Sequence, residues 1–129
     1  MGATRDVALT ELPFRGISLN AASGGSTTVT VVPSDSGVLL VNHQAGATTY
    51  TLPTVALAKG KMFWFFNVGA GGIVITGAST DVMVGLNGAE YDTVTFSTGS
   101  AMIGASAAIF CDGTNYFCIP FAGTAVYSG

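Results

Sequence analysis

Ser36-Gly-Val-Leu-Leu-Val-Asn42 is the first of three short apolar runs that decide the fold, and Thr49-Tyr-Thr-Leu-Pro53 and Gly60-Lys-Met-Phe-Trp-Phe-Phe-Asn67 are the others. Each run is rich in β-branched or aromatic residues and is closed by Gly, Pro or Asn, which is typical of β-strands. The centre of the third run has no polar residue, so both faces of that strand need a cover. We therefore expect its five residues to lie in the core or in an interface between subunits: Met62, Phe63, Trp64, Phe65 and Phe66.

Apolar residues spaced by two recur along the chain, and no window shows the period of a helix. We expect strands over residues 28–32, 38–42, 48–52, 61–68, 73–76, 82–84, 93–97, 101–103, 107–112 and 116–119. Short strands about ten residues apart, with turns rich in glycine, predict an all-β domain, an antiparallel β-sandwich of jelly-roll type. No segment repeats another closely enough to predict a solenoid or a propeller.

The composition is poor in charge. Charged residues make up 9% of the chain, whereas an ordinary soluble domain has about 25%. Hydrophobic residues make up 49%, yet no apolar run approaches the roughly 18 residues that a membrane-spanning helix needs, so we expect no membrane partner. A small domain with so few charges exposes large apolar patches, which usually mark interaction surfaces. We therefore expect a homo-oligomer.

The net charge of −3 includes only four basic residues: Arg5, Arg15, Lys59 and Lys61. They are scattered along the chain, whereas a nucleic-acid interface needs clustered cations to neutralise phosphates. We therefore expect no nucleic-acid partner. The first residues also lack the apolar segment of a secretory signal peptide, so we expect no such peptide.

Residues 1–25 differ from residues 26–129, which we assign to the β-sandwich domain. The apolar residues of this N-terminal segment are spaced mostly by two: Val7, Leu9, Leu12, Phe14, Ile17 and Leu19. Ser23-Gly24-Gly25 then forms a flexible joint. Two interpretations fit this pattern. The segment is either a first edge strand or frayed terminus of the domain, or an extended arm that lies on a neighbouring subunit or another protein.

The residues give no sign of an active site. The single histidine, His43, falls at an expected turn without a Ser or Cys partner, so we place it on the surface or in an interface. Asp81, Asn87, Glu90 and Asp92 form the only acidic cluster, and they lack the spacing of an EF-hand. Asp81 and Asp92 stay open as a glycosidase pair, although nothing favours them. We predict no catalytic residue, no metal and no cofactor.

A hairpin turn is predicted at Asp112-Gly-Thr-Asn115, between Cys111 and Cys118. Pairing across it sets Cys111 opposite Tyr116, and Ile109 opposite Cys118. The two sulfurs then share a face but lie diagonally, which suits the narrow geometry of a disulfide poorly. We expect free, semi-buried thiols, as in a protein assembled in a reducing cytoplasm. A second tight hairpin is predicted at residues 69–72, where four small residues, three of them glycine, follow an aromatic strand.

The order of these elements is informative. A Ser-Gly before an apolar strand, Thr-Leu-Pro53, Gly60 before an aromatic strand, Ile-Val-Ile-Thr76 and the closing Asp112–Asn115 hairpin follow one another between Ser36 and Ile119. In this order the chain resembles the small capsid decoration, or cement, proteins of tailed bacteriophages, and also modules in phage tail fibres. Only structural markers are carried over from the resemblance: Pro53, Gly60 and the Asp112–Asn115 turn.

The resemblance implies a non-enzymatic β-domain that forms trimers on the outer surface of a phage head. There it holds neighbouring major-capsid subunits together. In this interpretation the Met62–Phe66 strand supplies trimer or core packing, and the Val7–Leu19 arm supplies part of the capsid contact. The alternative is a tail-fibre or spike module that binds host-surface carbohydrate. In that case Trp64 and its phenylalanine neighbours form a platform on which sugars stack.

Overall fold

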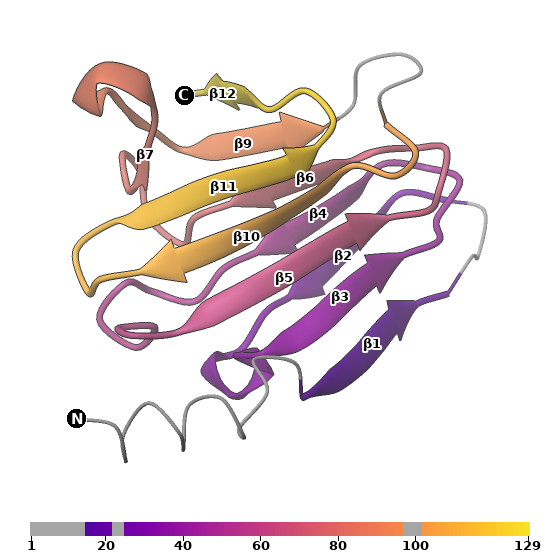
Figure 1. Ribbon diagram of the computed structural model, residues 1–129, viewed down its shortest axis with the longest axis horizontal. Helices are drawn as coiled ribbons and strands as arrows, with labels where there is room; N and C mark the ends of the chain where they lie inside the picture. The colour runs from indigo at the N-terminus through magenta and orange to yellow at the C-terminus, as the bar shows by residue number, and fades with distance from the viewer. Residues whose placement is uncertain (1–14, 22–24, 97–101) are drawn as a thin grey trace, which may run out of the picture.

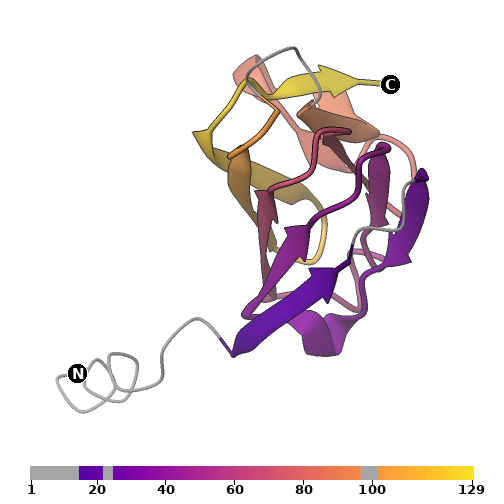
Figure 2. The same ribbon diagram turned by 90° about the vertical axis from the view of Figure 1, so that its right-hand side faces the viewer.

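The computed structural model describes residues 15–21, 25–96 and 102–129, which form two facing β-sheets (Figures 1 and 2). Sheet A has the strand order β1-β3-β5-β10-β11-β7-β8, and sheet B has the order β12-β9-β6-β4-β2. The strands are β1 (Gly16–Asn20), β2 (Thr27–Thr30), β3 (Val38–Asn42), β4 (Thr48–Thr51), β5 (Met62–Asn67), β6 (Ile73–Thr76), β7 (Met83–Val84), β8 (Glu90–Tyr91), β9 (Thr93–Phe96), β10 (Ser106–Cys111), β11 (Tyr116–Ala122) and β12 (Val126–Ser128). Two short 3-10 turns, Pro33–Asp35 and Leu86–Gly88, lie between strands.

The first six strands wind alternately through the two sheets. β1, β3 and β5 lie side by side and parallel in sheet A. β2, β4 and β6 do the same in sheet B. The chain therefore makes three stacked coils, each crossing from sheet A to sheet B and back. Antiparallel strands then complete the sheets, with β10 and β11 on β5, and β9 and β12 on β6.

The all-β prediction is confirmed, but the antiparallel jelly-roll arrangement is wrong, because both sheets are mixed. The reason lies at the corners between strands. Residues 69–72 do not fold β6 back beside β5 as a hairpin. They carry the chain across to the other sheet, where β6 pairs with β4. Three coils thus stack in register although no segment of the sequence closely repeats another.

Glycine is required where one corner lies on the next. A Cβ atom on Gly71 would lie 2.1 Å from the carbonyl oxygen of Gly46, and one on Gly69 would lie 1.9 Å from the carbonyl oxygen of Gln44. No other residue tolerates such a close approach of backbone to backbone. The stacked corners therefore fix the spacing of the second and third coils.

Three asparagines form a ladder beneath these corners, one from each coil. Asn20 Nδ2 donates to Asn42 Oδ1 at 2.9 Å, and Asn42 Nδ2 donates to Asn67 Oδ1 at 2.9 Å. Asn67 Nδ2 donates in turn to the carbonyl oxygens of Gly69 and Met102. Asn42 and Asn67 are fully buried. The ladder gives these buried amides the partners that they lose on leaving water.

The apolar core fills the space between the sheets. Its largest buried side chains include Phe63 and Phe65 of β5, Ile73 and Ile75 of β6, Phe96 of β9, Ile109 of β10 and Tyr116 of β11. The ring of Tyr50 meets that of Phe65 edge to face, with centroids 5.1 Å apart. Phe63 and Phe65, the inward residues of the aromatic strand, thus lie in the core.

Asn42→Leu should destabilise the fold by roughly 2–4 kcal/mol, because it leaves ladder groups of Asn20, Asn67 and Thr48 buried without their partner. Urea unfolding at one fixed protein concentration measures the change. His43→Leu is the matched control, since His43 is the exposed next residue. Equal stability of the two variants would show that the ladder contributes little.

Candidate interaction surface

The side of sheet A turned away from the core is apolar across six strands, β1, β3, β5, β10, β11 and β7. Along β5, Phe63 and Phe65 point inward, so Met62, Trp64 and Phe66 point outward. Strand pairing aligns them with apolar neighbours in three rows. The rows are Ile17, Leu39, Trp64, Ala108 and Ile119; Leu19, Val41, Phe66 and Ser106; and Met62, Phe110, Phe117 and Val84. We call these residues, together with Phe121, the outer face.

Several side chains of the outer face are strongly exposed. The exposed fractions are 70% for Ile17, 56% for Leu19, 38% for Phe66, 46% for Ile119 and 58% for Phe121. Phe121 stacks on Trp64 with ring centroids 5.7 Å apart and planes 16° apart. Fully burying a large apolar side chain contributes about 1.5–3 kcal/mol, so covering what these five leave exposed would contribute on the order of 5 kcal/mol per subunit.

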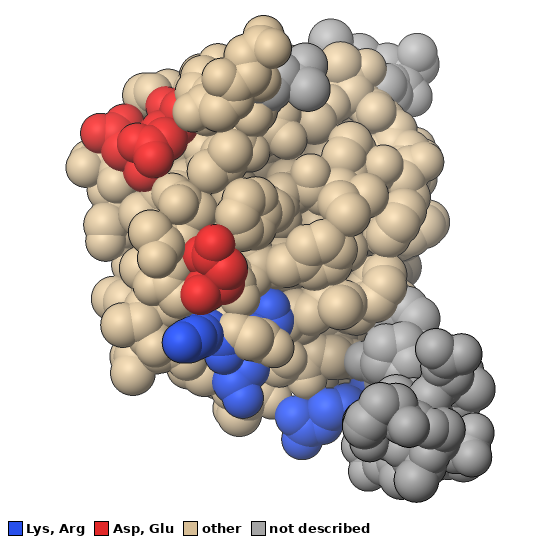
Figure 3. Space-filling view, turned by 60° about the vertical axis from the view of Figure 1, so that its left-hand side comes forward, with Lys and Arg blue, Asp and Glu red and all other residues tan. Residues whose placement is uncertain are grey.

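None of the residues named as the outer face is charged, and Ser106 is the single polar one among them; the row through Val84 ends at the exposed Glu90 on the edge strand β8. Figure 3 shows the charged side chains gathered in the lower and left parts of that view, beside a broad uncharged surface. The outer side of sheet B has a different character. Its side chains are mostly threonines: Thr28, Thr30, Thr49, Thr51, Thr76, Thr93 and Thr95, with Val74, Val126 and Ser128. Sheet B therefore presents hydroxyl groups to water, whereas sheet A presents an apolar surface that a partner would cover.

The structure brings two of the predicted residue groups together. Ile17 and Leu19 lie on β1, the edge strand of sheet A, and join Met62, Trp64 and Phe66 on the outer face. Val7, Leu9, Leu12 and Phe14 lie outside the described residues. Sequence reasoning missed Leu39, Val41 and Ile119, although their alternation with core residues was visible in the sequence.

The carboxylates of Asp92 and Asp112 accept hydrogen bonds from backbone N–H groups. Asp92 Oδ1 accepts a hydrogen bond from the backbone N–H of Asp81 at 2.7 Å, and Asp81 has a positive φ of 55°. Asp112 Oδ1 accepts from the N–H groups of Thr114 and Asn115, both at 2.8 Å, and these bonds lower the pKa of that carboxyl group. Within the described ranges, no three His, Cys, Asp or Glu residues lie close enough to hold a metal ion. In the same ranges no helix is long and apolar enough to cross a membrane.

The predicted cysteine hairpin is confirmed, with Cys111 opposite Tyr116 and Ile109 opposite Cys118. Both thiols are free. Burial raises the pKa of Cys118 to about 11, so this thiol is not a reactive thiolate at neutral pH. His43 is exposed, as expected.

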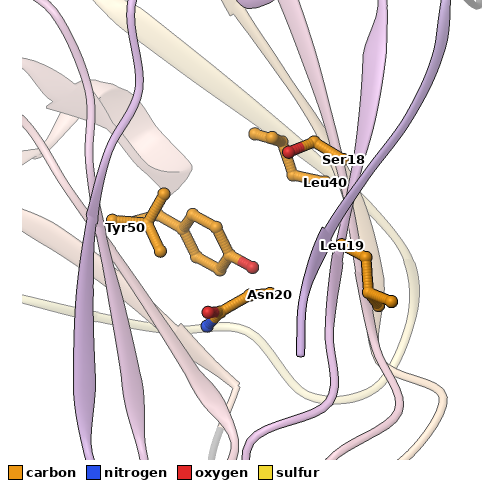
Figure 4. Close-up of a pocket in the computed structure, with 6 residues that line it drawn as sticks. Ser18, Leu19, Asn20, Leu40 and Tyr50 are labelled. Atoms are coloured by element: carbon orange, nitrogen blue, oxygen red, sulfur yellow. The ribbon is translucent and has the colours of Figure 1, made fainter. Parts of the chain in front are cut away.

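A cavity of about 140 Å³ lies between the edge strands of the two sheets (Figure 4). It is lined by Ser18, Leu19 and Asn20 of β1, Val29 of β2, Leu40 of β3 and Tyr50 of β4. Tyr50 is 1% exposed, and its hydroxyl group has no hydrogen-bond partner among the described residues. Burial raises the pKa of Tyr50 to about 12.

Alkaline pH should therefore weaken the fold through Tyr50. The folded state holds this proton more tightly than the unfolded chain, whose pKa is about 10. The resulting stability is present below pH 10 and is lost as the pH rises toward 12. Urea unfolding at pH 9 and pH 11 should show a smaller loss for Tyr50→Phe than for the wild type, by about 1 kcal/mol. An equal loss in both proteins would contradict this assignment.

No known protein family matches this chain, and no curated protein or solved structure is significantly similar to it.

Proposed function

We propose that this protein is a non-enzymatic structural subunit of a phage virion. It assembles as a homotrimer through the outer face of sheet A, sits on the outside of the head and cements neighbouring major-capsid subunits. The observation that carries the proposal is the uncharged outer face, with Ile17, Leu19, Phe66, Ile119 and Phe121 exposed on it. A surface of this kind is a common mark of a protein that functions in an assembly.

The outer face is large enough for association, but its area alone does not set the number of subunits. Two outer faces packed together would contribute on the order of 10 kcal/mol. Association itself costs an estimated 4–15 kcal/mol in lost translational and rotational freedom. The net free energy of a single contact is therefore marginal, and we propose the trimer from the phage resemblance. Sheet B keeps its threonines in water in such an assembly.

The residues that carry the phage resemblance are coupled in space, which supports treating them as one unit. The hydroxyl group of Tyr116, directly after the Asp112–Asn115 turn, donates to the carbonyl oxygen of Pro53. The N–H of Gly60 donates to the carbonyl oxygen of Cys111 at 2.9 Å. The Leu-Pro segment, the glycine before the aromatic strand and the closing hairpin thus support one another at one end of the coils.

Cementing a shell is a linkage effect. A protein that binds the assembled shell, and not its separate subunits, stabilises the shell by mass action. Many symmetry-related sites then multiply a modest affinity at each contact. The mechanism requires neither a catalytic residue nor a cofactor, and the proposal includes no contact with nucleic acid or membrane.

A tail-fibre module that binds host carbohydrate is the second candidate. The stacked pair of Trp64 and Phe121, with Phe66 exposed nearby, favours it, because sugars stack on exposed aromatic rings. Sugar recognition also needs polar groups that hold the hydroxyls, and the outer face offers only Ser106. We therefore rank it below assembly. Binding on a glycan array would reverse the order.

Ile119→Asp and Phe121→Asp together should convert a trimer to monomers, because each places a charge in the proposed interface. Size-exclusion chromatography with light scattering measures the mass. Thr49→Asp with Thr95→Asp is the matched control on the outer side of sheet B, and these variants should stay trimeric. A wild-type protein that is a monomer at high concentration would rule out assembly through the outer face.

Cryo-electron microscopy of purified virions that contain this protein tests the location. We expect density for the sheet pair on the outer surface of the head, over the junctions between capsid subunits. Density confined to the tail or its fibres would favour the carbohydrate-binding alternative. Removing residues 1–14 tests whether the preceding segment helps head binding, and it leaves β1 intact, whereas a deletion to residue 25 would remove an edge strand of sheet A.

A further inference from the structure

The cavity between the two sheets has a buried floor and an exposed rim. Tyr50 forms the floor and is 1% exposed, whereas Ser18 of β1 lies at the rim and is exposed to solvent. In the part of the chain that the structure describes, β1 and β2 are the outermost strands of sheets A and B. Each of these two walls is therefore held by strand pairing on one side only, and it can yield to a small molecule that enters from the rim.

The size of the cavity suits a molecule with a single ring. Its volume is about 140 Å³. An engineered cavity of about 150 Å³, lined by apolar side chains, is large enough to bind benzene. Ligands of the size of a drug occupy pockets of about 300 Å³ or more, so they are too large for this site. The volume therefore limits the ligand to one ring with few substituents.

The lining of the cavity decides the polarity of the ligand. None of the six lining residues is charged: Ser18, Leu19, Asn20, Val29, Leu40 and Tyr50. An ion placed here would lose its water without gaining a charged partner, which is costly. A sugar is also a poor fit, because its hydroxyl groups would outnumber the polar side chains of the walls. The cavity therefore favours a neutral and largely apolar molecule.

One polar group of the cavity has a hydrogen bond to offer. The hydroxyl group of Tyr50 is buried and makes no hydrogen bond within the described ranges. Figure 4 shows it pointing into the cavity, near Asn20. The amide of Asn20 is already engaged, since Nδ2 donates to Thr27 Oγ1 at 3.0 Å and to Asn42 Oδ1 at 2.9 Å. A buried hydroxyl group without a partner is unfavourable, so a ligand that brings a hydrogen-bonding atom to Tyr50 gains affinity from it.

We infer that this cavity binds a small neutral molecule with one ring and one hydrogen-bonding group, such as a phenol, whose oxygen bonds to the hydroxyl group of Tyr50. The ring lies against Val29 and Leu40, which are apolar parts of the cavity wall. The site lies between the sheets, whereas the outer face is the opposite side of sheet A, so a ligand and a neighbouring subunit do not compete for the same surface. This inference does not depend on the virion role.

Titration of the full-length protein with phenol and with benzene, followed through the methyl NMR signals of Val29 and Leu40, tests the inference. The wild type should bind phenol about fivefold more tightly than benzene, because phenol gains a hydrogen bond. Tyr50→Phe should reverse this preference, since the hydroxyl group of phenol would then enter the cavity without that partner. The variant keeps the ring that packs on Phe65, so it should fold and bind benzene as the wild type does.

A second pair of variants tests the location of the site. Val29→Phe should fill the cavity and abolish binding of both probes at Leu40. Thr28→Phe is the matched control, because Thr28 is the exposed neighbour on the same strand, and it should leave binding unchanged. The inference would be overturned by the absence of saturable binding in the wild type, or by saturation only at residues of the outer face. An equal preference for phenol in the wild type and in Tyr50→Phe would overturn it as well.

Discussion

The amide ladder of Asn20, Asn42 and Asn67 is the interaction on which the sheet arrangement depends. Each amide offers a donor and an acceptor, so Asn42 bonds to the coil before it and to the coil after it. This sets the register of β1, β3 and β5. Register decides which residues face outward, because a shift of one position would exchange the two faces of a strand. The row of Ile17, Leu39 and Trp64 on the outer face follows from the ladder beneath it.

The two sheets differ in the side chains that their outer sides present to solvent. Sheet A is apolar on both sides, with Phe63 and Phe65 inside and Trp64 and Phe66 outside. Sheet B is apolar only toward the core, and threonines cover its other side. An assembly that buries sheet A and leaves sheet B in water satisfies both. The proposed assembly would also account for the low charge of the chain, because a surface covered by other subunits does not need charged side chains.

Sequence reasoning reached most of the strands, the apolar character of both sides of the Met62–Phe66 strand and the pairing of Cys111 with Tyr116, because alternation and turn residues act locally. It missed the parallel winding, since alternation is the same in parallel and antiparallel sheets. The turns between strands determine which strands pair with each other. The glycines at residues 69–72 predict a tight hairpin. In the structure, Gly69 and Gly71 instead allow this turn to lie against the backbone of Gln44 and Gly46. One feature of the sequence did indicate the stacking: an asparagine ends each of the three parallel strands β1, β3 and β5.

The outer face of sheet A and the edge of β2 would lead to different kinds of association. An apolar sheet face buries a limited area and forms a closed group, whereas a free strand edge accepts another edge without limit. A subunit that associates through the outer face of sheet A therefore needs its edges covered. The far edge of the coils is covered by antiparallel strands. The edge of β2 lies over a cavity, beside the buried hydroxyl group of Tyr50, which has no hydrogen-bond partner in the described part of the chain. A strand placed there would leave the sheet face as the main route of association.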